Sequence, residues 1–474
     1  MKTMQEAFQS IETYSPAEER FNRRRRTAGL VLAPLIFLIV LAWPLPGLTP
    51  EAHRMAAVMA LVVVLWVSEA LPMAVVALLG PLVAVLLGVA GPRAAFASFA
   101  DPIIFLFIGS FMLAEAMFVH GVDRRIAYTA LSWPAIGRSG PRILLVYAAV
   151  STGLSMWISN TATTAMMFPI GMSLIAHMSK ASRKGRGDAR RFAMAMMLVT
   201  AFGASIGGMA TPGGTPPNLI GIGLIDRIQG THVSFLRWMA LGVPLVLLLF
   251  AALVAFFHLT CARGVATGEG SAALVRDELK KLGAMKRGER NVLLAFGVTV
   301  LLWVTPGILA LAGLDQGGLG QRFTQVVPES MAALCGALLL FLLPVNWRAR
   351  RFTLTWEEAM RIDWGIVLLY GGGLALGDLA FSTGLAKATG DALTAWLPSQ
   401  STLALVATFT GLAILLSEAT SNTAAANMIV PVAIAVAQAA GVDPPLPAAQ
   451  WGVVLHEVAL GDHAQPGAGQ LLAS

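Results

Sequence analysis

Charged residues are scarce in this 474-residue chain: Asp, Glu, Lys and Arg make up 12%, hydrophobic residues make up 56%, and the mean hydropathy is +0.72. A soluble globular domain carries about 25% charged residues, so the composition excludes that class and indicates an all-α polytopic membrane protein. Only two cysteines are present, Cys261 and Cys335, which excludes a disulfide framework and a cysteine metal site. The formal charge of +7 comes mainly from arginines in short polar loops, where it indicates membrane orientation and not nucleic-acid binding.

Long apolar runs predict the membrane spans, because a spanning helix needs about 20 apolar residues. The predicted spans are residues 28–46, 55–68, 72–90, 102–120, 192–214, 237–259, 291–313, 328–345 and 364–381. Two pairs of shorter runs, 143–158 with 162–178 and 402–416 with 424–440, each flank a Ser-Asn-Thr triplet. Arms of about 16 residues are short for crossing, so we expect two re-entrant helical hairpins; two short spans joined by a polar turn are the alternative.

Basic residues fall mainly on one side of this predicted topology. They are Arg23 to Arg26, Arg124, Arg125, Arg138, Arg142, the runs Lys180 to Arg191 and Arg263 to Arg290, and Arg348, Arg350, Arg351 and Arg361. The opposite side carries scattered charges such as Arg54, Arg93, Arg227, Arg322 and Lys387. By the positive-inside rule the N-terminus is cytoplasmic, and we expect a bacterial inner membrane.

The two halves of the chain repeat at a constant offset. The triplets begin at Ser159 and Ser421, and 421 − 159 = 262; Asp101 and Asp363, and Gly109 and Gly371, share this shift. The predicted topology puts Asp101 outside and Asp363 inside, so the repeats are inverted. Inverted repeats are typical of secondary transporters, which bind substrate and coupling ions near the membrane midplane.

Each triplet marks a break between two helices, where carbonyls of one arm and N–H groups of the other face the midplane, with Asn160 or Thr161 able to cap. Ser155 lies four residues before Ser159, on the same helical face, as Ser417 lies before Ser421. Such hydroxyl, carbonyl and amide oxygens suit an alkali cation. A third break is predicted at 207–218, where Gly and Pro are too dense for a continuous helix.

Fixed positive charge is absent from these segments. Residues 143–178, 192–225 and 402–440 contain no Lys or Arg, and their only acid is Glu418. A bound anion there must be met by neutral donors and helix N-termini, with balancing charge from co-bound cations. The pattern predicts cation-coupled anion uptake; we expect Glu418 to be a buried hydrogen-bonded carboxylate or a proton-sensitive element.

Four segments carry a family resemblance: residues 157–170 (WISNTATTAMMFPI), 417–426 (SEATSNTAAA), 214–218 (GTPPN) and 66–75 (WVSEALPMAV). From about residue 28 to 440 the chain resembles the divalent anion/sodium symporter family of dicarboxylate transporters. The resemblance implies a homodimer with a fixed scaffold and a transport domain that carries both hairpins and moves as an elevator. It implies a small dicarboxylate such as succinate, or a tricarboxylate, as substrate and co-transported sodium.

Family roles can be carried over onto matching residues. The resemblance implies a first sodium site at Ser155, Ser159, Asn160 and Gly214, and a second at Ser417, Thr420 and Asn422. Substrate carboxylates would contact Asn160, Thr161, Thr215, Pro216, Asn422 and Thr423.

The expected domains follow from the spans and the repeat. They are a cytoplasmic tail (1–27), scaffold spans (28–142), the first hairpin with the broken helix (143–259), a cytoplasmic amphipathic linker (260–290), scaffold spans of the second repeat (291–401), and the second hairpin with a final segment (402–474). The repeat requires a second Gly/Thr/Pro break past residue 460, but residue 474 corresponds only to 474 − 262 = 212. We therefore expect a truncated or frame-shifted C-terminus.

Three other functions compete with symport. An exchanger of the same family needs fixed positive charge near its substrate, and a truncated chain with the right fold could be a non-transporting remnant. A membrane aspartyl protease is a distant rival, because Tyr370 and Leu376-Gly377-Asp378 match such an enzyme only weakly. No metalloprotease, serine hydrolase or nucleotide-binding motif is present, so we expect no enzyme activity.

Overall fold

The structure is a computed structural model that describes residues 16–133, 139–181, 186–262, 270–314, 317–396 and 401–441. Residues before 262 form α2 (Pro16–Ala42), α3 (Pro50–Ser68), α4 (Met73–Leu86), α5 (Pro92–Phe96), the 3-10 helix η1 (Ala97–Ala100), α6 (Pro102–His120), α7 (Val122–Leu131), α8 (Gly140–Ser155), α9 (Asn160–Ala181), α10 (Arg186–Gly208), α11 (Pro216–Gln229), α12 (Phe235–Phe257) and the π-helix η3 (His258–Ala262). The later residues form α13 (Gly270–Leu282), α14 (Arg287–Leu311), α15 (Gly318–Val326), α16 (Glu329–Leu342), β1 (Pro344–Asn346), β2 (Arg351–Phe352), α17 (Trp356–Ala359), α18 (Trp364–Ser382), α19 (Leu385–Trp396), α20 (Thr402–Ala419) and α21 (Asn422–Ala439).

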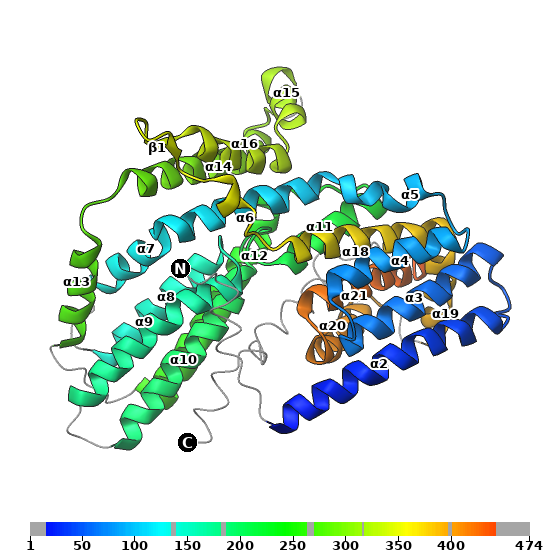
Figure 1. Ribbon diagram of the computed structural model, residues 1–474, viewed down its shortest axis with the longest axis horizontal. Helices are drawn as coiled ribbons and strands as arrows, with labels where there is room; N and C mark the ends of the chain where they lie inside the picture. The colour runs from blue at the N-terminus through cyan, green and yellow to red at the C-terminus, as the bar shows by residue number, and fades with distance from the viewer. Residues whose placement is uncertain are drawn as a thin grey trace.

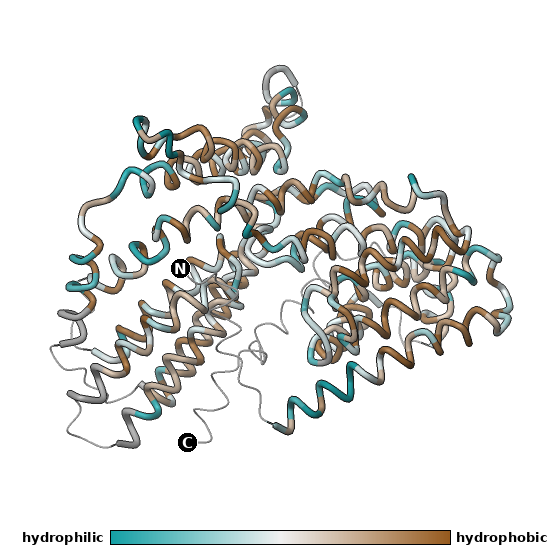
Figure 2. The backbone as a smooth tube through the Cα atoms, in the orientation of Figure 1, coloured by the Kyte–Doolittle hydropathy of each residue, from teal (hydrophilic) through white to brown (hydrophobic). Residues whose placement is uncertain are grey.

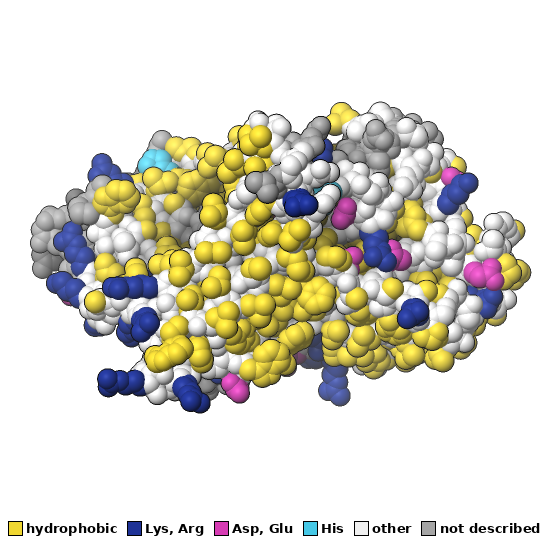
Figure 3. Space-filling view, turned by 90° about the horizontal axis from the view of Figure 1, so that it is seen from above, with side chains coloured by type: hydrophobic (Ala, Val, Ile, Leu, Met, Phe, Trp, Pro, Cys, Tyr) yellow, Lys and Arg dark blue, Asp and Glu magenta, His cyan; other side chains and the backbone are white. Residues whose placement is uncertain are grey.

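The prediction of an all-α polytopic membrane protein is confirmed. Eight helices within the described ranges are long and apolar enough to cross a membrane. Figure 2 shows apolar residues, in brown, along most of the length of the long helices. A broad apolar area also crosses the face shown in Figure 3, with Lys and Arg gathered mainly toward its left end. The structure adds elements that hydropathy did not predict, notably α15 and the short antiparallel pair β1–β2.

Helix ends differ from the apolar runs where capping residues lie outside them. Helix α2 begins before the run at 28–46 and includes Arg23 to Arg26, because polar residues can extend a helix beyond the apolar layer. Helix α3 begins after Thr49, whose side chain accepts a hydrogen bond from the Ala52 N–H. The predicted span 192–214 ends earlier, as α10 stops at Gly208.

The offset of 262 persists in the helix boundaries. Helices α6, α8 and α9 begin at 102, 140 and 160, and α18, α20 and α21 begin at 364, 402 and 422. Asp101 lies at the start of α6 and Asp378 near the end of α18, yet both contact Arg227. Because the start of one helix lies beside the end of the other, α6 and α18 run in opposite directions, as inverted repeats require.

Glycines let α6 and α18, which are equivalent helices of the two repeats, each approach a neighbouring short helix closely. A Cβ on Gly109 of α6 would lie 2.6 Å from the backbone of Ala333 on α16, and one on Gly372 of α18 would meet the backbone of Ala77 on α4. The long helix of each repeat thus packs against a short apolar helix, and a glycine makes the close contact possible. Such close packing holds helices together in lipid, where the hydrophobic effect does not drive their association.

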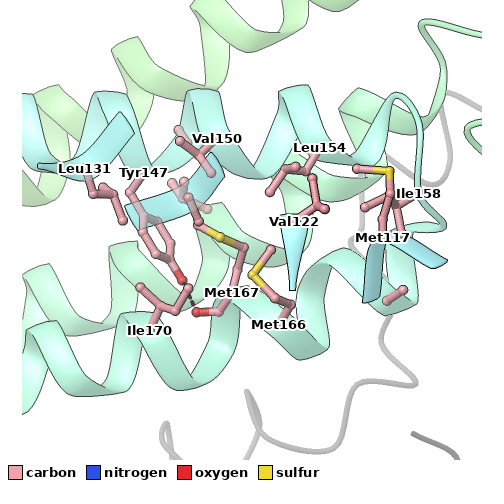
Figure 4. Close-up of a cluster of buried hydrophobic side chains, with 14 of the residues drawn as sticks. Met117, Val122, Leu131, Tyr147, Val150, Leu154, Ile158, Met166, Met167 and Ile170 are labelled. Atoms are coloured by element: carbon pink, nitrogen blue, oxygen red, sulfur yellow. Dashed lines mark hydrogen bonds between the residues drawn. The ribbon is translucent and has the colours of Figure 1, made fainter. Parts of the chain in front are cut away.

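The helices gather into two groups in Figure 1. Helices α7 to α10 lie together on the left, α2 to α4 and α18 to α21 on the right, and α6 and α11 run between them. The left group has a buried core in which Tyr147 of α8 reaches across to α9 and donates to the Met167 carbonyl at 2.8 Å (Figure 4). A separate core joins α11, α18 and α21.

Candidate functional site

The first hairpin turns over residues 156–159, between α8 and α9. Ser155, fully buried at the end of α8, donates from Oγ to Oδ1 of Asn160 at 2.8 Å. The Ser159 Oγ accepts from the Ala162 N–H at 3.3 Å, so Ser159 caps α9. The expectation that Asn160 or Thr161 caps this helix is wrong, because the residue before them already fills that role.

The predicted third break lies between α10 and α11 and packs onto this hairpin tip. Thr211 donates from Oγ1 to the Met156 carbonyl. Any Cβ on Gly208 would collide with the Asn160 side chain, and one on Gly214 would collide with the Gly208 carbonyl. The structure therefore brings Ser155, Asn160 and Gly214 into one region through Gly208.

Thr215 and Pro216 begin the next half-helix. Thr215 is the N-cap residue of α11 and is buried at 3% exposure, and Pro216 follows at the first helical position. Helix α12 supports the break from outside, because Trp238 donates from Nε1 to the Met209 carbonyl at 3.0 Å. Pro216 and Pro217 carry no N–H, and the Asn218 N–H donates to the Thr215 carbonyl at 3.2 Å, so the start of α11 would attract an anion through the positive end of its helix dipole.

The second hairpin turns between α20 and α21 but is bonded differently. Ser417 donates to the carbonyls of Ala413 and Ile414 within its own helix, unlike Ser155, which reaches forward to an asparagine. Ser421 caps α21 by accepting from the Ala424 N–H at 3.2 Å. The two tips match in capping, but α20 continues to Ala419, past the counterpart of the α8 end at Ser155, and their buried serines have different partners.

The segment 66–75 receives the second hairpin tip. Thr420 donates to the Trp66 carbonyl at 3.1 Å, and the Ser421 hydroxyl lies 3.1 Å from Sδ of Met73. Sequence reasoning used this segment only as a family marker and missed its contact with the tip. Glu69, whose φ of 49° is left-handed, marks a sharp turn after α3. This turn does not indicate that the second hairpin tip packs against the segment.

Burial separates most of the two sets of candidate residues. Among the candidate cation ligands, Ser155, Gly214, Ser417 and Thr420 are buried. Most candidate substrate contacts lie nearer the surface: Thr161 is exposed, and Asn160, Pro216, Asn422 and Thr423 are half-buried. Helix α11 links the surroundings of the two tips, because it starts beside the first tip and packs against α21.

Charged side chains near these segments differ from the expectation in one respect. Glu418 is exposed, so the expectation of a buried carboxylate is wrong. Arg227 lies at the far end of α11, about 17 Å from Pro216 at 1.5 Å per residue. Its Nε lies 2.9 Å from Oδ2 of Asp378, and its Nη1 lies 3.6 Å from Oδ2 of Asp101.

The same contacts remove the basis for a protease. Tyr370 donates to Asp101 at 3.4 Å, and Asp378 accepts from Ser98 at 2.7 Å as well as from Arg227. Asp378 and Tyr370 therefore belong to an ionic cluster around Arg227, in which Asp378 is held as an ion-pair partner.

Comparison with known proteins identifies the family. The family model described as the sodium:sulfate symporter transmembrane region matches residues 24–460. The sodium-dependent dicarboxylate transporter SdcS of Staphylococcus saprophyticus is 34% identical over 425 residues, which cover 88% of this chain and 79% of that protein. SdcS of Staphylococcus aureus strain USA300 is 34% identical over 427 residues, with the same coverage.

A solved structure shares the fold. The crystal structure of the Alcanivorax borkumensis YdaH transporter, described as revealing an unusual topology, aligns with a TM-score of 0.51 and 14% sequence identity. The alignment covers 96% of this chain and 90% of that chain. From the family model and the relatives above 30% identity, this chain belongs to the sodium:sulfate symporter family of membrane transporters and is not an enzyme.

Proposed function

We propose that this protein takes up a small dicarboxylate together with sodium, as the names of its relatives and the chemistry of its two hairpins suggest. The observation that carries the proposal is the joining of Ser155, Asn160, Gly208 and Gly214 at a helix break, within residues 192–225, which contain no Lys or Arg. Hydroxyl, amide and carbonyl oxygens there suit sodium, and the N-terminus of α11 suits a carboxylate.

The proposed first sodium site consists of Ser155, Ser159, Asn160 and Gly214, and the second of Ser417, Thr420 and Asn422. Substrate carboxylates would contact Asn160, Thr161, Thr215, Pro216, Asn422 and Thr423. The deeper burial of most sodium residues supports this division, because the ions would then lie beneath the anion that they balance.

The proposal includes movement of both hairpins past a scaffold in a homodimer, as the family resemblance implies. In this scheme α8 to α12 and α20 to α21 form the moving part, and α2 to α6 and α14 to α18 form the scaffold. Alternating access by rigid-body movement of one part against another is the usual behaviour of inverted repeats.

The proposed membrane is a bacterial inner membrane with a cytoplasmic N-terminus, and polar contacts between Arg-rich segments support this orientation. Arg125 pairs with Glu289 at 2.8 Å, and His120 Nε2 lies 2.6 Å from the Thr353 carbonyl, so three Arg-rich segments meet on one side. Arg227 and its two aspartates meet on the other. The excess of Lys and Arg on the first side favours the cytoplasm.

Uptake of labelled succinate into proteoliposomes, with sodium replaced by choline, tests the proposed function. We expect uptake to require sodium, and Ser155→Ala to raise the sodium concentration that gives half-maximal uptake. Thr305→Ala is the control, because it also removes one hydroxyl from a helix, but this hydroxyl donates to the Leu301 carbonyl on α14, away from the site. Succinate exchange that proceeds equally well in choline would instead identify an exchanger.

A further inference from the structure

Asn218 is a buried polar residue that the proposed sodium and substrate sites leave without a role. It is fully buried at the third position of α11. Its Nδ2 donates to the Gly208 carbonyl and to the Thr211 carbonyl, both at 2.9 Å. One side chain thus joins the first turn of α11 to the last residue of α10 and to the middle of the loop between them.

The orientation of this amide follows from its partners. Reversing it would place Oδ1 against two carbonyl oxygens, which repel it, whereas Nδ2 supplies the two donors that they need. Oδ1 then remains buried without a hydrogen-bond partner. A buried unpaired oxygen destabilises a fold, so a residue with this arrangement is expected to do something that a simple apolar residue could not.

The two carbonyls that accept these hydrogen bonds belong to residues that shape the proposed first sodium site. Gly208 contacts the Asn160 side chain on one face, while Gly214 packs against the Gly208 carbonyl. Thr211 ties the same loop to Met156 in the hairpin tip. Fixing the carbonyls of Gly208 and Thr211 therefore fixes the distance between Asn160 and Gly214.

We infer that Asn218 is a positioning residue that holds the break between α10 and α11 in the shape required for cation binding. The inference rests on the proposed function, because it assigns Asn218 to the first sodium site. Asn218 acts through the loop carbonyls and is not itself a sodium ligand. Its role requires two donors on one side-chain atom, which neither aspartate nor leucine provides.

The test compares Asn218→Asp and Asn218→Leu with the wild type. In purified protein, the melting temperature is measured against sodium chloride, with choline chloride keeping the ionic strength constant, because a bound ion stabilises the folded state. In cells, the sodium concentration for half-maximal succinate uptake gives a second measurement that does not depend on how much transporter folds. We expect both variants to need about tenfold more sodium, the loss expected when buried hydrogen bonds to one group are removed.

Asn291→Asp is the matched control. The Nδ2 of Asn291 also donates to two acceptors, the Pro344 carbonyl at 3.2 Å and Oγ1 of Thr353 at 2.8 Å, but in the joint beside β1 and β2. This variant is expected to lower the melting temperature without changing the sodium dependence.

The remaining outcomes separate the inference from the proposed function. If sodium does not stabilise the wild type and does not drive its uptake, the proposed function fails. If the wild type responds to sodium and both Asn218 variants respond at the same concentration, the positioning role is overturned. Tighter sodium binding by Asn218→Asp would overturn it too, because a carboxylate improves the site only if this side chain contacts the ion directly.

Discussion

At the scale of single residues, glycines set how closely the first hairpin and the broken helix approach. Gly208 leaves no room for a methyl group beside Asn160, and Gly214 leaves none beside the Gly208 carbonyl. Gly153, two residues before the end of α8, has no atom of another segment within 4 Å of the position where its Cβ would lie. The difference arises because Gly208 packs against the Asn160 side chain and Gly214 against the Gly208 backbone, whereas Gly153 faces open space.

Gly208→Ala is expected to reduce sodium-dependent uptake at least about tenfold, since overpacking costs about 1–3 kcal/mol and here separates the loop from Asn160. Gly153→Ala is the control and is expected to keep uptake and raise stability by about 0.5–1 kcal/mol, because alanine favours a helix interior. Transport rates and melting temperatures of both variants check the pair. Equal uptake by Gly208→Ala and the wild type would contradict the close contact.

Prediction from sequence succeeded for some residues of the site and failed for others. The triplets and the Gly/Pro-rich break are visible because polar and helix-breaking residues stand out in apolar segments. Capping by Ser159 and Ser421, and the forward bond of Ser155, depend on the path of the chain around the tip. The role of Asn218 depends on two carbonyls brought close by the fold, which no spacing reveals.

At the scale of elements, Arg227 connects one helix of the proposed moving part to two helices of the proposed scaffold. It lies near the end of α11 and contacts Asp101 before α6 and Asp378 on α18. An elevator movement of α11 past α6 and α18 must stretch or break these ion pairs. The pairs therefore favour the arrangement seen here.

Arg227→Gln is expected to shift the population away from this arrangement by up to about fivefold, because a half-exposed ion pair contributes about 0.2–1 kcal/mol. The two native cysteines are first replaced (Cys261→Ala and Cys335→Ala), so that spin labels attach only to cysteines introduced on α11 and α18. Double electron–electron resonance between these labels then measures the population of this arrangement. Glu51→Gln is the control, because Glu51 pairs with Arg54 inside a single helix. A distance distribution identical to that of the wild type would show that the ion pairs of Arg227 do not favour this arrangement.

The loop between α11 and α12 contains a second ionic joint. His232 lies 3.8 Å from Asp226 and 3.5 Å from Glu329, and these two carboxylates raise the pKa of His232 from 6.5 to about 10. Because the pKa is raised in the folded protein, the joint contributes fully below about pH 6.5 and is lost as the pH rises through about 10.

Hydrogen exchange of the loop at residues 230–234 is expected to quicken as the pH rises toward about 10, beyond the ordinary increase of the intrinsic rate with pH. His232→Gln should exchange quickly at every pH, because glutamine carries no charge for the carboxylates to hold. A protected loop in this variant at pH 7 would argue against the ionic joint.

At the scale of the whole molecule, the inverted repeat explains the arrangement of α6 and α18. The constant offset predicts equivalent helix starts, and the structure has them at 102 and 364 and at 160 and 422. The sequence could not predict that the tips would differ in their contacts, because Thr420 meets Trp66 through the packing of α20 beside α3. The expected second break and truncated end fall beyond residue 441, outside the described residues, and the depth of the hairpins remains a prediction.

The near absence of ionisable groups from the two hairpins and the broken helix has an electrical consequence. Residues 143–178, 192–225 and 402–440 contribute one carboxylate, Glu418, and no Lys or Arg. A membrane voltage does work on charges that move within the membrane, at about 2.3 kcal/mol per elementary charge for each 100 mV, and the other charged residues of the proposed moving part, such as Arg142, Arg190 and Arg237, lie outside these segments. The voltage would therefore act mainly on the cargo. Two sodium ions with a dianion carry no net charge and would produce almost no current, whereas a third sodium ion would make each turnover carry one positive charge, which is measurable as a current.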